Sequence, residues 1–289
     1  MRLTAPAPRT NAAPARRTTT VPALGISTAP APRTTTLASH GPAWLLAIVA
    51  FAVTALLFLA QPPRLALAYE ALDVQQGGRI HGRIVFHGEA PRPEPVTVSK
   101  DAHVCGKQIP DESLVVGEGS GVAQAVVYLA DIQAGRPVDT AVEGVLDNHR
   151  CRFEPHVQAL SVGQVLVISN SDPILHNTHS YVLEGTQGNR FNLALPRQGQ
   201  KIRRPLRLPG IHQVRCDAGH TWMNAYFLVF EHPYHTVTGA DGEFALDGIP
   251  PGEYTLSVWH EKLGKTSRSV RVGPGADVVL PDLVLTLKK

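Results

Sequence analysis

The residues best suited to chemistry in this sequence are four sulfur and nitrogen donors in two short segments. Cys216, His220 and Met223 follow one another with C-x3-H-x2-M spacing in CDAGHTWM, and His176 lies upstream in NSDPILHNTH. A thiolate, two imidazoles and a thioether are the ligand set of a mononuclear blue-copper site, in which Cys and two His lie in one plane and Met is a weak axial ligand. The pattern therefore predicts a site for one copper ion that passes single electrons.

Other interpretations of these residues stay open at this point. Zinc favours Cys, His and carboxylate ligands, and a thioether suits it poorly. The chain has only two methionines, Met1 and Met223, so a chance match at the ligand position is rare. A sandwich of the same type that has lost its metal is the remaining alternative.

Short strands must position these donors, because the chain after residue 69 shows almost no helical pattern. β-Branched and apolar residues alternate and are interrupted by Gly, Pro and Asp. The expected strands are residues 79–86, 122–129, 165–169, 213–215, 225–230, 242–246, 254–259, 270–272 and 278–287. Strands this short at near-regular spacing predict an all-β fold of sandwiches. Residues 165–169 would deliver His176, and residues 213–215 would deliver Cys216.

The middle of the chain resembles the cupredoxin family. The motif residues run in the family order F-x-P, G, N and H-N, at Phe153 to Pro155, Gly163, Asn170 and His176-Asn177. The resemblance covers roughly residues 145–232 and implies a Greek-key β-sandwich with the ligands at one pole. It also implies that Asn177 braces the ligand loops by hydrogen bonds and tunes the thiolate.

The ligand loop departs from the commonest family spacing. Amicyanin-like loops read C-x2-H-x2-M, whereas C-x3-H-x2-M resembles the second half of the loop that holds the binuclear copper centre of cytochrome oxidase subunit II. That centre needs another Cys four residues before Cys216, where this chain has His212. One thiolate predicts one copper ion. The longer loop leaves a blue site, a red site and an approach of His212 to the metal as alternatives.

The flanking segments resemble carboxypeptidase-regulatory, transthyretin-like domains. GADGEFALDGIPPGEYTLSVWHE is similar to their closing hairpin, and GGRIHGRIVFHG is similar to their opening strand. The expected division is a disordered basic leader with a signal peptide or membrane anchor (1–68), the first strands of a transthyretin-like sandwich (69–142), the cupredoxin domain (143–232) and the closing transthyretin-like hairpins (233–289). The cupredoxin domain is either inserted in the second sandwich, as chain ends that lie close on a surface permit, or the β units follow in series.

The leader predicts export. Residues 1–40 are rich in Ala, Pro, Thr and Arg and cannot pack a core. The apolar run at 43–60 has a length between that of a signal peptide and that of a membrane helix, and Ala66-Leu67-Ala68 offers an A-x-A cleavage site. We expect a periplasmic or extracellular protein whose apolar helix is either cleaved off or retained as a membrane anchor.

The leader also carries the basic character of the chain. Residues 1–68 contain six of the 27 basic residues and none of the 24 acidic ones. The rest has 21 basic and 24 acidic residues, a net charge of −3. We therefore expect no nucleic-acid partner.

Two cysteines remain if Cys216 binds metal. In an exported protein, Cys105 and Cys151 are most simply a disulfide. Two free thiols are one alternative, and a second metal site of Cys151 with His156 is another.

Two side chains near the ligands allow more than one role. Trp222 either packs under the loop or forms an apolar docking surface over the exposed edge of a copper imidazole, since electron-transfer partners meet through small interfaces. His179 follows His176 by an odd number of residues and should face away from the metal if the segment is a strand.

The sequence lacks the common catalytic motifs. It contains no G-x-S-x-G, P-loop, H-E-x-x-H or C-x-x-C-H. We therefore expect no enzyme. The prediction is an exported one-electron copper carrier with a redox protein as partner. The alternatives are a non-redox module that binds carbohydrate or protein, and periplasmic copper handling.

Overall fold

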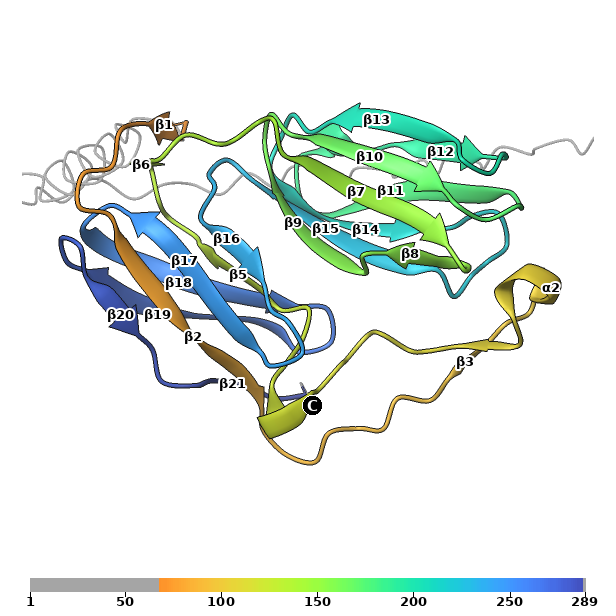
Figure 1. Cartoon of the computed structure of the whole chain (residues 1–289), viewed down its shortest axis with the longest axis horizontal. Helices are drawn as coiled ribbons and strands as arrows, with labels where there is room; N and C mark the ends of the chain where they lie inside the picture. The colour runs from red at the N-terminus through yellow and green to blue at the C-terminus, as the bar shows by residue number, and fades with distance from the viewer. Residues whose placement is uncertain (1–67, 288–289) are drawn as a thin grey trace, which may run out of the picture. The chain divides into compact units, whose positions relative to one another are not determined.

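The computed structural model describes residues 68–287, and this part of the chain is almost entirely β structure (Figure 1). The expected disordered segment and the apolar helix at 43–60 lie outside the described residues. No helix within residues 68–287 has the length and apolar character needed to span a membrane.

The first sandwich packs a four-stranded sheet against a five-stranded one. The first sheet has the order β13 (Lys201–Pro205), β10 (Val165–Asn170), β7 (Glu143–His149) and β8 (Arg152–Glu154). The second has the order β12 (Asn192–Leu195), β11 (His176–Gly185), β14 (Gly210–Arg215), β15 (Asn224–Phe230) and β9 (Val157–Ser161). Antiparallel pairing joins β11 to β14 and β14 to β15. The candidate ligands lie at the start of β11 and on the loop between β14 and β15.

The core between these two sheets is built by alternation. Leu166 and Ile168 on β10 are fully buried, and their neighbours along the strand are less so, because successive side chains of a strand point to opposite faces. They pack with Leu146, Phe153 and Phe227 in one apolar cluster. Cys216 and Met223 belong to the same cluster, so two of the candidate ligands are continuous with the hydrophobic core.

The second sandwich has its own core. One sheet has the order β16 (His235–Val237), β5 (Val126–Leu129), β18 (Gly252–His260) and β19 (Gly264–Val272). The other has β17 (Glu243–Ile249), β2 (Gly78–Phe86) and β20 (Asp277–Val279), with β21 (Leu283–Leu285) also paired to β2. Strands before residue 130 thus pair with strands after residue 234, and the chain between them forms the first sandwich. This pairing corresponds to the inserted arrangement.

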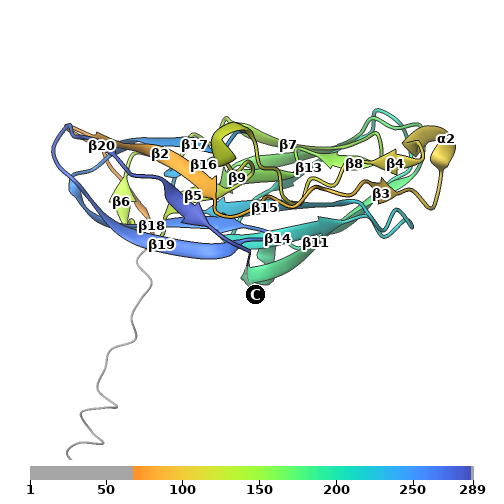
Figure 2. The same cartoon turned by 90° about the horizontal axis from the view of Figure 1, so that it is seen from below.

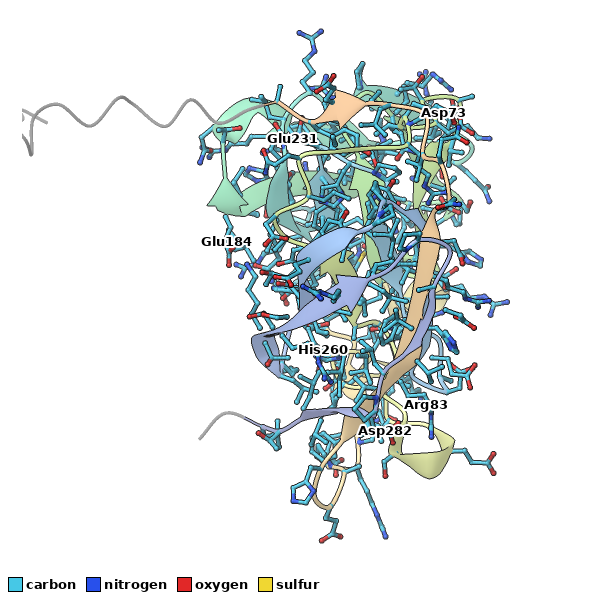
Figure 3. The ribbon with its side chains drawn as sticks, turned by 90° about the vertical axis from the view of Figure 1, so that its left-hand side faces the viewer. Asp73, Arg83, Glu184, Glu231, His260 and Asp282 are labelled. Atoms are coloured by element: carbon cyan, nitrogen blue, oxygen red, sulfur yellow. A yellow bond between two sulfur atoms is a disulfide. The ribbon has the colours of Figure 1, made fainter. Side chains whose placement is uncertain are left out.

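The tight turn before β17 packs against β2 and connects the early and late parts of the second sandwich. Gly242 has a φ of 75°, and the N–H of Ile84 donates to its carbonyl at 2.8 Å. A Cβ at this position would lie 2.2 Å from the carbonyl oxygen of Ile84, so only glycine fits. Arg83 fixes the same turn by donating to the carbonyls of Asp241 and Gly119; it is labelled in Figure 3 beside the 3-10 turn η1 (Glu118–Ser120).

A long excursion between β2 and β5 runs from the second sandwich to the far end of the first (Figures 1 and 2). We call residues 96–109 the strap. It consists of β3 (Val96–Thr97), the one-turn helix α2 (Ala102–Cys105) and β4 (Gln108–Ile109), with β3 and β4 paired antiparallel. The expected disulfide is present and joins Cys105 of the strap to Cys151 of the first sandwich.

The all-β expectation is confirmed, with local differences. The segment expected as one strand at 122–129 forms a strand only from Val126, because Gln124 adopts a φ of 61° in a turn. The expected strand at 278–287 is divided into β20 and β21 around Pro281, which has no N–H for a sheet ladder. The remaining short elements are β1 (Glu70–Ala71), β6 (Ala134–Gly135) and η2 (Gln187–Asn189).

Candidate metal centre

Three of the four predicted donors, His176, Cys216 and His220, meet where β11 begins and β14 ends. His176 is the first residue of β11, and Cys216 follows the last residue of β14. The antiparallel register pairs His179 with Arg215, which brings these two ends together. The expectation that residues 165–169 deliver His176 directly is wrong, because β10 ends at Asn170 and a turn precedes β11.

Both imidazoles present Nδ1 to the sulfur. Sγ of Cys216 lies 3.9 Å from Nδ1 of His176 and 3.6 Å from Nδ1 of His220. The donor atoms of these three residues all lie within 4.8 Å of one another. Both imidazoles are 0% exposed and Cys216 is 4% exposed, so water is excluded from the cluster.

These separations fit a single ion. With metal bonds of about 2.0–2.3 Å to nitrogen and sulfur, the two sulfur–nitrogen separations correspond to angles of roughly 110–130° at the ion. Such angles bracket those of a trigonal plane, the arrangement of Cys and two His in blue-copper sites. The rings of His176 and His220 have centroids 4.7 Å apart and are tilted by 51°.

Met223 closes the ligand loop. Its N–H donates to the carbonyl of His220 at 2.9 Å, and its carbonyl accepts from the N–H of Cys216 at 3.4 Å. The side chain is 2% exposed and packs in the same apolar cluster as Cys216. The loop therefore returns to β15 with Met223 inside the pole of the sandwich.

The electrostatics of the cluster favour a thiolate. Burial raises the pKa of Cys216, but hydrogen bonds from His176 and from the backbone amides of Asn177 and Ala218 lower the pKa more. Burial likewise lowers the pKa of His176, but its hydrogen bonds to Asp172 and Cys216 outweigh burial and raise the pKa to about 9. Each group thus favours the charged form of the other, and a thiolate is the form of cysteine that binds metals.

Each imidazole is held by a carboxylate at its other nitrogen. Oδ2 of Asp172 lies 2.9 Å from Nε2 of His176, and Oδ2 of Asp101 lies 2.9 Å from Nε2 of His220. These contacts fix which nitrogen faces the sulfur. Neither carboxylate was predicted from the sequence. Asp172 precedes His176 by four residues and offered a local signal, whereas Asp101 is 119 residues from His220 and offered none.

Asn177 connects the two ligand segments. Its backbone N–H donates to Sγ of Cys216 at 3.3 Å, and its side-chain oxygen accepts from the N–H of Asp217 at 3.2 Å. Its side-chain amide donates to Asn192 at 2.6 Å. These are the contacts that a residue bracing the ligand loops would make.

Trp222 is partly buried and packs under the loop. Its indole N–H donates to the carbonyl of Cys151 at 3.1 Å, and its ring meets the ring of His220 edge-on at 5.4 Å between centroids. The expected exposed edge of a copper imidazole is wrong, since His220 is fully buried and its Nε2 faces Asp101. Trp222 therefore does not lie over an open imidazole edge.

The other histidines considered from the sequence lie apart from the cluster. His179 contacts Oδ2 of Asp217 at 2.6 Å, as expected for a side chain facing away from His176. His212 stacks on Phe227 in the core and hydrogen-bonds to Ser180. His156 pairs with Glu261, and Cys151 is in a disulfide, so the alternative of a second metal site of Cys151 with His156 is wrong.

Comparison with known proteins places one of the two resemblances on the chain. The family model described as the carboxypeptidase regulatory-like domain matches residues 220–286. This match begins in the ligand loop and runs through β15 to β21. No curated protein matches the chain significantly.

Several solved structures are similar to about a third of the chain. A copper-containing nitrite reductase from Thermus scotoductus SA-01 has a TM-score of 0.27 and 19% identity, over 32% of this chain and 23% of its own length. A purple cupredoxin from Nitrosopumilus maritimus has a TM-score of 0.26 and 20% identity, over 30% of this chain and 99% of its own. Amicyanin from Paracoccus versutus has a TM-score of 0.25 and 13% identity, over 36% of this chain and 96% of its own. Similarity at this level does not decide function, which depends on the site residues.

Proposed function

We propose that this protein is an exported one-electron carrier in which Cys216, His176, His220 and Met223 would hold a single type 1-like copper ion. The observation that carries the proposal is the convergence of the buried Cys216 sulfur and two Nδ1 atoms, at sulfur–nitrogen separations of 3.6 and 3.9 Å. The buried thioether at the end of the same loop completes the donor set.

Copper suits this donor set better than zinc. A structural zinc site is normally closed by four Cys or His ligands, and here the fourth residue is a methionine. The carboxylates near the cluster, Asp172 and Asp101, face Nε2 of the imidazoles rather than the sulfur. Soft thiolate and thioether ligands beside two imidazoles select copper over zinc.

The residues of the chain have separable roles in this proposal. Bound copper would supply reversible one-electron oxidation and reduction. His176 and His220 present Nδ1 because their Nε2 atoms are held by carboxylates, and the N–H of Asn177 lowers the electron density on Sγ of Cys216. The buried pole excludes water from the donors. Donors packed in a core have little freedom to rearrange between oxidation states, as electron transfer requires.

The remaining parts of the proposal concern location and partners. The Cys105–Cys151 disulfide supports export, because disulfides persist in oxidising compartments. We propose a periplasmic or extracellular location, a redox protein as partner and no catalytic activity of its own.

Copper binding by the full chain tests the proposal. Wild-type protein loaded with Cu(II) is expected to retain about one equivalent of copper after dialysis and to show intense thiolate-to-copper absorption with an EPR spectrum of one Cu(II) species. Cys216→Ala is expected to lose the absorption. His179→Gln is the matched control, since His179 lies on the same strand but contacts Asp217 instead of the cluster.

Two other outcomes would redirect the assignment. A colourless wild-type protein that retains no copper would contradict the proposal, and retention on a glycan array would then favour the carbohydrate-binding alternative. Copper that binds but passes rapidly to a Cu(I) chelator, without reversible voltammetry, would favour copper handling over electron transfer.

A further inference from the structure

The pole of the first sandwich is covered by a segment that belongs to another part of the chain. The chain leaves the second sandwich after β2, and the strap that follows reaches the ligand loop with α2 at its tip (Figures 1 and 2). Val98 and Ile109 pack in the core cluster of the first sandwich, and three further contacts hold the strap at the pole. Cys105 is bonded to Cys151, Nζ of Lys100 donates to the carbonyl of Ala218 at 2.5 Å, and Asp101 meets His220.

Asp101 has a backbone conformation that serves the ligand contact rather than its own helix. It precedes α2 at the position where an aspartate normally caps the helix with its side chain. Its φ and ψ are 52° and 36°, in the left-handed region, and its side chain makes no capping hydrogen bond. Its carboxylate is instead directed to Nε2 of His220. Residues other than glycine adopt this conformation at a cost in free energy, and the conformation persists where the surrounding structure enforces it.

The contact reaches the ring on the side opposite the sulfur. Nδ1 of His220 lies 3.6 Å from Sγ of Cys216, and Nε2 lies 2.9 Å from Oδ2 of Asp101. Lys100, the neighbouring cation, is directed to a backbone carbonyl of the ligand loop. The Asp101 carboxylate is therefore available to the imidazole as a charged hydrogen-bond acceptor, and its side chain is only 28% exposed.

We propose that Asp101 is a positioning residue of the metal centre: it fixes the ring of His220 through Nε2 and places a negative charge one imidazole away from the ion. This inference rests on the proposed copper function. A carboxylate on the far side of a ligating imidazole raises the basicity of the ligand and orients it. The added negative charge stabilises Cu(II) relative to Cu(I), so Asp101 lowers the reduction potential.

Two substitutions separate the hydrogen bond from the charge. In the copper-loaded full chain, Asp101→Asn keeps an acceptor for Nε2–H without the charge and is expected to shift the reduction potential to more positive values. Asp101→Ala removes the acceptor as well and is expected to broaden the EPR spectrum. In the Cu(I) form, Asp101→Ala should make the Nε2–H proton of His220 exchange with solvent at least about tenfold faster by NMR, since a charge-assisted hydrogen bond of this kind contributes about 1.5–3 kcal/mol. Asp101→Glu keeps both the charge and the acceptor. It is expected to retain part of the wild-type reduction potential, EPR spectrum and proton exchange rate.

Asp217→Asn is the matched control. Asp217 follows Cys216 directly, but its carboxylate contacts His179 and Tyr181 and no candidate ligand. This variant removes the same charge near the ion without touching His220, so its potential is expected to shift less than that of Asp101→Asn.

The outcomes distinguish the two proposals. Copper binding by the wild type with an unchanged potential and unchanged exchange in the Asp101 variants would overturn the role of Asp101 alone. If the reduction potential of Asp217→Asn shifts as much as that of Asp101→Asn, the shift reflects only the loss of a nearby charge. That result would also overturn the role of Asp101. Failure of the wild type to bind copper would overturn the proposed function and, with it, this inference.

Discussion

The carboxylate of Asp172 lies 2.9 Å from Nε2 of His176, across the ring from Cys216. The same carboxylate accepts the backbone N–H groups of Arg150 and Cys151, each at 2.8 Å. Asp172 is 4% exposed and belongs to the first sandwich, so this support of a candidate ligand is part of the core. Asp101 supports His220 in the same way from a segment that the disulfide attaches.

The difference between these two carboxylates predicts different stability costs. Asp172→Ala is expected to lower the free energy of unfolding of the metal-free protein by about 2–3 kcal/mol, because it leaves the buried amide of Cys151, the partly buried amide of Arg150 and one buried imidazole without their charged acceptor. Urea unfolding monitored by tryptophan fluorescence measures the change. Asp217→Asn is the control, since Asp217 is 43% exposed and a surface ion pair contributes only about 0–1 kcal/mol. Equal losses in the two variants would contradict the structural role given to Asp172.

Met223 offers a test of the axial position that separates packing from ligation. Met223→Leu keeps an apolar side chain of similar volume in the core and is expected to cost less than about 1.5 kcal/mol of unfolding free energy. Met223→Ala should cost about 2–5 kcal/mol because it leaves a cavity. Both variants should retain copper on the three remaining donors. Loss of the thioether should raise the reduction potential in Met223→Leu, because the axial ligand helps to set it. Voltammetry of the two copper-loaded variants checks this, and an unchanged potential would show that Met223 is a core residue only.

The local part of the site could be predicted from the sequence. Cys216, His220 and Met223 lie on one loop between β14 and β15, so their spacing alone brings them close. His176 could be predicted as a ligand only from the family resemblance, because the pairing of β11 with β14 is what brings it to that loop. Strand β11 itself reads HNTHSYVLEG and is too polar at its start to be recognised by apolar alternation.

The distant part of the site could not be predicted. Asp101 reaches His220 because the excursion between β2 and β5 crosses from one sandwich to the other, and because the Cys105–Cys151 disulfide fixes the strap there. Nothing in the spacing of Asp101 indicates this course, and its use as a partner for His220 goes against its usual role as a helix cap. The burial of His220 follows from the same contact, which is why the expectation of an open imidazole edge was wrong.

His212 predicts a pH dependence of stability that is independent of the metal. Burial lowers its pKa from the ordinary 6.5 to about 4. Ser180 lies 2.9 Å from its Nδ1, and its Nε2 has no hydrogen-bond partner in the described structure. Between pH of about 6.5 and about 4 the unfolded chain binds a proton that the folded ring does not bind. Stability should therefore fall as the pH falls through this window, by up to about 1.4 kcal/mol per pH unit for this one group.

The variant His212→Leu isolates this contribution. Burial also lowers the pKa of His232 and His260 to about 4 and that of His235 to about 3, so the wild type should lose stability in acid for several reasons. In His212→Leu, the slope of unfolding free energy against pH should be smaller in the same window, by up to about 1.4 kcal/mol per pH unit, which is the contribution of one proton. Urea unfolding at pH 7, 6 and 5 measures the two slopes. Parallel slopes would show that His212 is solvated or already protonated in the folded protein.

The disulfide gives the last prediction, because it connects the stability of the fold to the closure of the site. Replacing Cys105 and Cys151 together with alanine opens a loop of 46 residues and should lower the free energy of unfolding by about 3–4 kcal/mol in the chain-entropy model. The strap would then be held by Lys100, by Asp101 and by the packing of Val98 and Ile109 in the core of the first sandwich. Its tip would be freer to move, so copper should pass to a chelator faster than in the wild type at a denaturant concentration where both proteins are folded. Asp101→Ala is the comparison, since it loosens the strap at His220 while leaving the disulfide intact. If the cysteine variant is less stable but releases copper at the wild-type rate, the strap stabilises the fold without closing the metal centre.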